Sequence, residues 1–125
     1  MTNLSKKIEE ICEKDKRYKP DGYEFVMEAF SFTRGKLKRQ GHISGKELSE
    51  GCAEFGIDCY GPMARTVLVC WGITKTQDFG NIVFNLIDAK LFSKTEGDSI
   101  EDFEDVYDFT AVFSNVLDNS FIKLS

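Results

Sequence analysis

The order of helix and strand signals from residue 42 to residue 109 most limits the folds open to this chain. Three patterns of helical period follow one another over residues 44–56, 62–72 and 76–89. The third is the strongest, because its apolar residues recur at the spacing of one helix face: Phe79, Ile82, Val83, Leu86 and Ile87. After it, Leu91–Thr95 and Asp102–Tyr107 predict two strands joined by a turn. We therefore expect an α+β fold that is mainly helical and carries a small antiparallel β-hairpin.

Further helices are expected on both sides of this region. An apolar stripe over residues 4–12 predicts a first helix that ends near Asp15. The stretch Asp21–Arg39 is apolar on two sides, which is typical of a helix packed between other elements. A last helix is expected to start at Asp108 or Thr110. The length of the chain fits one domain, residues 1–125, in which 1–20 form the N-terminal helix and loop and 119–125 a weakly determined tail.

Local capping signals place two of the helix starts. Ser44 and Glu47 have the spacing of a capping box, and Ile43 and Leu48 that of a hydrophobic staple around it. This helix is expected to end at Gly56, before a turn at 58–61. Residues 74–77 suggest a second capping box. Gly80, inside the helix that follows, costs about 1 kcal/mol against Ala, which close packing explains better than a ligand at the helix start.

Charge is distributed unevenly along the chain. The formal net charge is −5, but residues 1–46 hold 11 basic and 7 acidic side chains, whereas residues 47–125 hold 5 and 14. The helix predicted over 76–89 has no Lys or Arg, and the stretch 96–108 has seven acidic side chains and no basic one. Such asymmetry can mark a nucleic-acid or membrane surface, but attraction between the two halves within the fold explains it as well.

The segment Ile82–Lys94 resembles the third helix and first wing strand of winged-helix domains. This resemblance implies a winged-helix-like core with a reading helix for DNA. DNA affinity depends on Lys and Arg at the phosphates, and neither the helix over 76–89 nor the stretch 96–108 has any, so specific DNA binding is not expected. A nucleic-acid-associated function remains the alternative through the basic segment 34–46, with these contacts: Arg34, Lys36, Lys38, Arg39 and Lys46.

A second resemblance covers about three quarters of the chain, from Tyr18 to Phe113. It is carried by short motifs along this run: Arg17-Tyr18, Tyr23–Val26, His42–Gly45, Phe55-Gly56, Trp71–Ile73, Asp78–Leu86, Ser93–Thr95, Asp102-Phe103 and Tyr107–Phe109. In these motifs the chain resembles a family of small conserved bacterial proteins of unknown function. The resemblance implies no activity and no catalytic residues.

Cysteine and histidine offer little for catalysis or metal binding. The chain has four cysteines and one histidine and no C-x-x-C pair, whereas zinc sites use about four such ligands, often in close pairs. His42 could act as a general base, but it has no evident nucleophile, and its place beside a helix cap is the better explanation. Cys59 is expected as a surface thiol in a turn, and the other three cysteines in the core: Cys12, Cys52 and Cys70. We expect no catalytic residue, no cofactor and no metal site, although a weak cation site at the acidic stretch stays open.

Aromatic residues point to a binding function. With 11 Phe among 125 residues, these rings must either fill the core or leave an apolar patch for a partner. Phe84 lies off the apolar stripe of its helix, so it is either an exposed anchor or covered by the last helix through Val112, Phe113 and Val116. The sequence favours a non-enzymatic interaction or regulatory domain that binds a protein partner or itself, in the cytoplasm and without membrane contact. The residues predicted to bind the partner are Phe84, Asp98, Glu101, Glu104 and Asp105.

Overall fold

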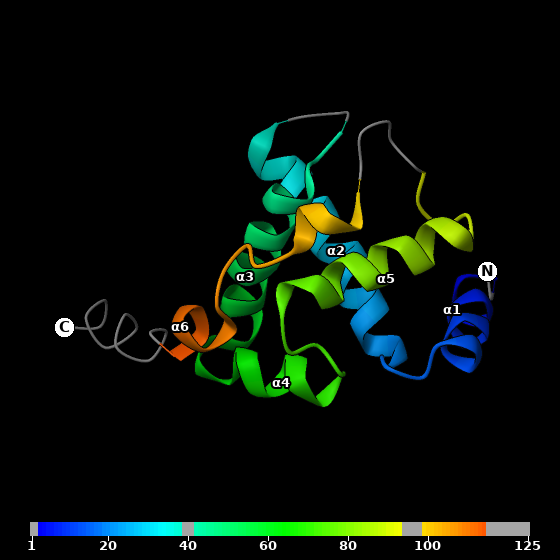
Figure 1. The fold of residues 1–125 in the computed structure, drawn as a ribbon, viewed down its shortest axis with the longest axis horizontal. Coiled ribbons are helices and arrows are strands. Elements are labelled where there is room, and N and C mark those ends of the chain that lie inside the picture. Colours follow the sequence, from blue (N-terminus) through cyan, green and yellow to red (C-terminus); the bar gives the residue numbers. More distant parts are fainter. Residues whose placement is uncertain (1–2, 39–41, 94–98, 115–125) are drawn as a thin grey trace.

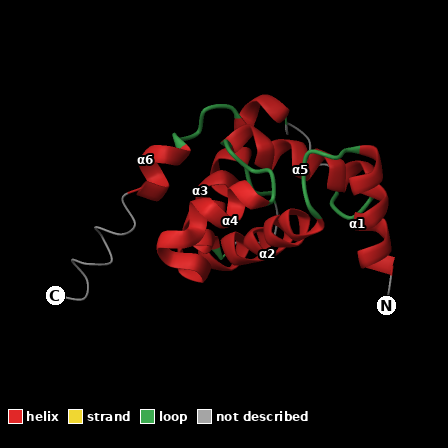
Figure 2. Ribbon diagram, turned by 90° about the horizontal axis from the view of Figure 1, so that it is seen from below, coloured by secondary structure: helices red, strands yellow, loops and turns green. Residues whose placement is uncertain are grey.

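The computed structural model describes residues 3–38, 42–93 and 99–114. In these ranges every regular element is a helix and no strand occurs (Figure 1, Figure 2). The α-helices are α1 (Asn3–Lys14), α2 (Pro20–Leu37), α3 (Gly45–Tyr60), α4 (Ala64–Cys70), α5 (Thr76–Asp88) and α6 (Phe109–Ser114). Two short 3-10 helices join them, η1 (Gly61–Met63) and η2 (Ile100–Phe103).

Helix α2 is the central element, packed against both α3 and α5 (Figure 1). Helices α1 and α6 lie at opposite ends of the molecule in both views (Figure 1, Figure 2). Fully buried side chains from α1 to α5 meet in one core: Ile8, Tyr23, Cys52, Leu68, Phe79, Ile82 and Leu86. Three predicted helices are confirmed: those at the N-terminus, at residues 21–39 and at residues 76–89. Each has apolar residues at helical spacing, and these form the face that the helix buries.

The start of α3 is confirmed and its predicted end is wrong. The Ser44 hydroxyl accepts a hydrogen bond from the Glu47 backbone N–H, and the Glu47 carboxylate accepts one from the Ser44 N–H. The helix continues past Gly56, however, and ends at Tyr60, followed by the C-cap Gly61, whose φ of +53° suits a residue without a side chain. Gly56 instead faces the Phe25 ring, where an added Cβ would lie 3.4 Å from the ring. This glycine thus lies inside the helix and does not end it.

The predicted β-hairpin is absent from the described residues, so the α+β, winged-helix-like fold is wrong. Residues 90–92 form the end of α5: Lys90 is left-handed, and the backbone N–H groups of Leu91 and Phe92 both donate to the Leu86 carbonyl. The predicted return strand is η2 followed by turns. Part of the first predicted strand, residues 94–95, lies outside the described residues.

Two interactions explain why residues 99–106 do not pair as a strand. Ser99 caps η2: its hydroxyl accepts from the Glu101 N–H, and its own N–H donates to the Asp102 carboxylate. Thr76, at the start of α5, donates from its hydroxyl to the Phe103 carbonyl at 2.6 Å and accepts from the Val106 N–H at 3.2 Å. Two backbone groups of the predicted strand, the Phe103 carbonyl and the Val106 N–H, are thus bound to a side chain of α5.

Gly80 and Gly51 allow two close contacts in this fold. A Cβ added to Gly80 would lie 2.8 Å from the Phe103 ring, so the glycine makes room for η2. The packing explanation for this helix-interior glycine is confirmed, with an aromatic ring in place of a crossing helix. A Cβ added to Gly51 of α3 would lie 1.8 Å from the Thr33 hydroxyl of α2. Helices α2 and α3 therefore cross at a distance that only glycine allows.

The polar side of α5 is bound by the loop between α1 and α2. Tyr18 donates from its hydroxyl to the buried Asp78 carboxylate at 2.5 Å, and Asn81 donates to the Tyr18 oxygen at 2.9 Å. One helical turn later, Asn85 donates to both Asp15 and Tyr23. Burial, together with Asp78, raises the pKa of Tyr18, and burial raises the pKa of Tyr23 to about 12. Both phenols stay protonated at neutral pH; Tyr18 holds the loop on α5, and Tyr23 joins α2 to it.

Candidate binding pocket

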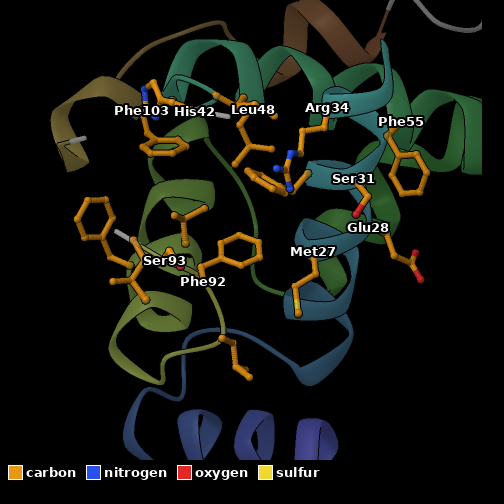
Figure 3. Close-up of a pocket in the computed structure, with 17 residues that line it drawn as sticks. Met27, Glu28, Ser31, Arg34, His42, Leu48, Phe55, Phe92, Ser93 and Phe103 are labelled. Atoms are coloured by element: carbon orange, nitrogen blue, oxygen red, sulfur yellow. The ribbon is translucent and has the colours of Figure 1, made fainter. Parts of the chain in front are cut away.

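A large apolar pocket opens between α2, α5 and the start of α3 (Figure 3). Its volume is about 890 Å³, within the range of about 300–1,000 Å³ that is usual for ligand sites. Its described lining comes from α2, the residues before α3, α3 itself, α5, the turn after α5, and η2. The lining residues are Met27, Glu28, Phe30, Ser31, Arg34, His42, Ile43, Gly45, Leu48, Phe55, Val83, Phe84, Ile87, Leu91, Phe92, Ser93 and Phe103.

Aromatic rings from three separate segments form much of the pocket wall. Phe30 of α2 and Phe92 after α5 pack together with ring centroids 4.9 Å apart. Phe84 of α5 lines the same pocket, and all three side chains are half-buried. The turn at the end of α5 places Phe92 opposite α2, because Lys90 takes the left-handed conformation that reverses the chain. The pocket wall thus depends on the turn after α5, which lies where the sequence predicts the first strand of the hairpin.

Phe84 fits neither of the two positions considered from the sequence, an exposed anchor or a ring covered by the last helix. It is neither fully exposed nor covered by the described part of α6, which packs against α3 and α4. The rings of α6, Phe109 and Phe113, pack with Phe79 and Tyr107 instead. Val116 lies outside the described residues. Phe84 keeps one face toward the core and contributes to the pocket wall.

Arg34 brings a permanent positive charge into this apolar wall. Its guanidinium lies over the Phe30 ring, 5.4 Å from the centroid, and the close-up shows the side chain directed into the pocket (Figure 3). Glu28 also lines the pocket, but its carboxylate points away from Arg34 (Figure 3). A guanidinium stays protonated and offers five N–H donors in a planar fork that fits a carboxylate.

The other cations of the basic segment are arranged differently. Lys36, two residues after Arg34, forms an ion pair with Glu54 of α3. Lys38 and Lys46 are exposed, and Arg39 lies outside the described residues. Since Arg34 lines the pocket and Lys36 is paired, the described residues provide no specific observation in favour of a nucleic-acid surface.

Acidic residues flank the pocket residue Phe103 in the sequence of η2 and the turn after it. Phe103 closes one part of the pocket wall, and the exposed residues around it carry carboxylates: Glu101, Asp102, Glu104 and Asp105. Three of the predicted partner-binding acids are therefore close in sequence to a pocket residue, although on a 3-10 helix and the turn after it and not on a hairpin. The fourth, Asp98, lies outside the described residues.

The residues considered for catalysis or metal binding are not brought together. His42 is exposed and lines the pocket, and no cysteine is among the described lining residues. In the described ranges, no group of three or more His, Cys, Asp or Glu side chains is placed to hold a metal ion. All four cysteines are free thiols: Cys52 is buried and Cys59 exposed as predicted, but the core position predicted for Cys70 is wrong, because it is exposed at the end of α4.

Sequence reasoning missed Phe30 and Phe92 as site residues and assigned Arg34 to another function. Only Phe84 gave a signal, because it lies off the apolar stripe of its helix. The Ser99–Asp102 spacing is a capping-box signal that would have predicted η2 in place of a strand. Nothing local in the sequence indicates that Phe30 meets Phe92.

Comparison with models of known protein families, with curated proteins and with solved structures gave no match. The resemblance to small conserved bacterial proteins stays a prediction from the motifs of the sequence. No helix in the described ranges is long and apolar enough to cross a membrane.

Proposed function

We propose that the protein is a non-enzymatic interaction domain whose pocket receives apolar side chains of a protein partner. The single observation that carries this proposal is the pocket of about 890 Å³ with the rings of Phe30, Phe84 and Phe92 in its wall. Aromatic side chains in a concave apolar site are typical anchors of protein recognition. A groove between two helices is also a common receptor for an amphipathic helix.

Charge beside the pocket favours a basic partner segment. The acidic residues of η2 and the turn after it are exposed and are neighbours in the chain of Phe103, which lines the pocket. A partner helix with Lys or Arg beside its apolar anchors would satisfy both surfaces, and the charges would raise the rate of association. Salt weakens the charge contribution, because the Debye length falls to about 3 Å at 1 M ionic strength.

The test uses a model peptide, an 18-residue amphipathic helix of Leu and Lys, and its counterpart of Leu and Glu. Binding to the full chain is measured by isothermal titration calorimetry and located by NMR chemical-shift changes. The Leu/Lys peptide should bind more tightly than the Leu/Glu peptide, and the shift changes should surround Phe84. Phe84→Ala should weaken binding about tenfold or more, the loss expected for an interface anchor.

Met63→Ala is the matched control, because Met63 is 55% exposed on η1 and does not line the pocket. Circular dichroism checks that both variants keep their helices. Equal peptide affinity in the two variants, or equal affinity for the two peptides, would contradict the proposal. So would a dimer in sedimentation that Phe84→Ala dissociates, since the occupant would then be a second copy of this chain.

A further inference from the structure

We infer that the docking surface continues from the pocket along the seam between α2 and α3 to Tyr60, and that this outer part binds basic side chains of the partner helix. The inference rests on the proposed function, and it adds where the charges of the partner lie. Three carboxylates of α2 provide the opposite charge: Asp21, Glu24 and Glu28. The partner would then have apolar anchors in the pocket and Lys or Arg about two helical turns away from them.

A row of aromatic rings leads from the pocket to the surface at the end of α3. Phe55 lines the pocket and packs against Phe25 of α2, with ring centroids 5.5 Å apart. Phe25 also packs against Tyr60 at 6.5 Å, and Tyr60 meets Trp71 edge-on at 5.9 Å. Tyr60 is 36% exposed, whereas Phe25 is buried. The row thus ends on a ring that is accessible to solvent, and such a ring attracts a cation placed over its face.

Glu28 joins this outer surface to the pocket. Its side chain lines the pocket, and the close-up shows its carboxylate directed away from the pocket interior (Figure 3). Burial is the main cause that raises the pKa of Tyr60, and the charges of Glu28 and Asp21 add to it, so both carboxylates lie near the exposed ring. Glu24 shares their face of α2, because residues 21, 24 and 28 recur at helical spacing. All three carboxylates are exposed, and the helix dipole explains only Asp21, in the first turn.

The charges of α2 determine which end of the partner is basic. Asp21 and Glu28 are about 10 Å apart along the helix axis, so the cations of the partner lie within about two turns of its apolar anchors. The last turn of α2 is basic instead, and Lys36 there is paired with Glu54. The partner helix therefore carries its cations at the end that lies over the start of α2. Each exposed ion pair contributes up to about fivefold in affinity, and a cation over the Tyr60 ring adds a similar factor.

The experiment measures binding of the Leu/Lys and Leu/Glu helices to charge-reversal variants by calorimetry at about 0.15 M ionic strength. Glu28→Lys changes a carboxylate at the pocket, and Glu24→Lys changes one that does not line it. Each should weaken binding of the Leu/Lys helix about fivefold or more and strengthen binding of the Leu/Glu helix. Glu50→Lys is the matched control, because Glu50 is an exposed carboxylate of α3 that neighbours Tyr107 and does not line the pocket. Its affinities should stay within about twofold of the unaltered chain.

Salt and NMR give two further measurements. At about 1 M ionic strength the Debye length is about 3 Å, so the losses in Glu24→Lys and Glu28→Lys should shrink, whereas the loss in Phe84→Ala should remain. The chemical-shift changes caused by the Leu/Lys helix should include Tyr60 as well as Phe84. Circular dichroism checks that every variant keeps its helices.

The outcomes distinguish this inference from the proposed function. Losses in Phe84→Ala and in both charge variants of α2 support both. Binding that depends on Phe84 but is equal in Glu24→Lys and Glu50→Lys, or that leaves the Tyr60 signals unchanged, overturns the outer surface and leaves the interaction domain. Binding that depends on Glu24 and Glu28 but not on Phe84 supports the charged surface and overturns the pocket as the anchor site. If neither helix binds, both are wrong.

Discussion

The contact between Gly51 and Thr33 offers a direct test of how tightly α2 and α3 cross. In Gly51→Ala the new Cβ would meet the Thr33 hydroxyl at 1.8 Å, the Thr33 Cβ at 2.9 Å and its Cγ2 at 3.1 Å. Rotation of the threonine side chain moves only the outer atoms, so the two helices must separate. The threonine hydroxyl also donates to the Ala29 carbonyl at 2.7 Å, and movement puts that bond at risk. Overpacking costs about 1–3 kcal/mol, and since the contact is far below van der Waals distance we expect the upper part of that range.

Helix propensity opposes this loss, because alanine is about 1 kcal/mol better than glycine inside a helix. The expected net effect of Gly51→Ala is a loss of about 2 kcal/mol in the free energy of unfolding. Chemical denaturation followed by circular dichroism measures it. Gly35→Ala is the control, since a Cβ there meets nothing within 4 Å and the substitution should be neutral or stabilising. A Thr33→Ala/Gly51→Ala double variant should recover part of the loss. Gly51→Ala as stable as Gly35→Ala would refute the close crossing.

Two other predictions concern titratable groups. A disulfide reagent at neutral pH should label Cys59 and Cys70 in the folded protein. Cys52 should react only on unfolding, because burial raises the pKa of its thiol and blocks access to it. Fast labelling of Cys52 in the folded protein would contradict this prediction and show that α3 opens. Hydrogen bonds from Arg17 are the main reason that the pKa of Asp15 is lowered in the folded protein. The contribution of Asp15 to stability is therefore present above the unfolded pKa of about 3.9, and it is lost as the pH falls toward the lower folded pKa. Asp15→Asn should therefore be less stable than the unaltered chain at pH 6, and the difference should shrink below pH 4 in denaturation curves; a difference that stays constant to pH 2 would contradict this.

Local patterns in the sequence determined most of the helices. The starts of α3 and α6 follow from Ser44 and Asp108, whose side chains accept hydrogen bonds from backbone N–H groups two or three residues later. The buried face of α5 follows from its apolar spacing. These features involve neighbours within one or two turns, and such interactions are encoded in a short stretch of chain whatever packs around it.

The conformation of residues 90–107 depends on tertiary contacts and not on local patterns. The sequence predicts a hairpin here, but the conformation of this segment depends on contacts of Phe103 with Thr76 and Gly80, which are more than 20 residues away in the chain. A hydroxyl that bonds two backbone groups and a glycine that accepts a ring are contacts without a local pattern. They outweigh a weak strand propensity, because β-propensity depends mainly on the neighbours that the strand finds.

The pocket is a tertiary feature for the same reason. The sequence singled out Phe84 by its place off the helix stripe, but Phe30 and Phe92 come from segments that meet only when α2 and α5 pack. The sequence places Arg34 in a basic segment, whereas in the fold its guanidinium lies over the Phe30 ring. Periodicity determines which face of each helix is apolar, whereas the shape between helices depends on where they cross, and Gly51 allows the close crossing of α2 and α3.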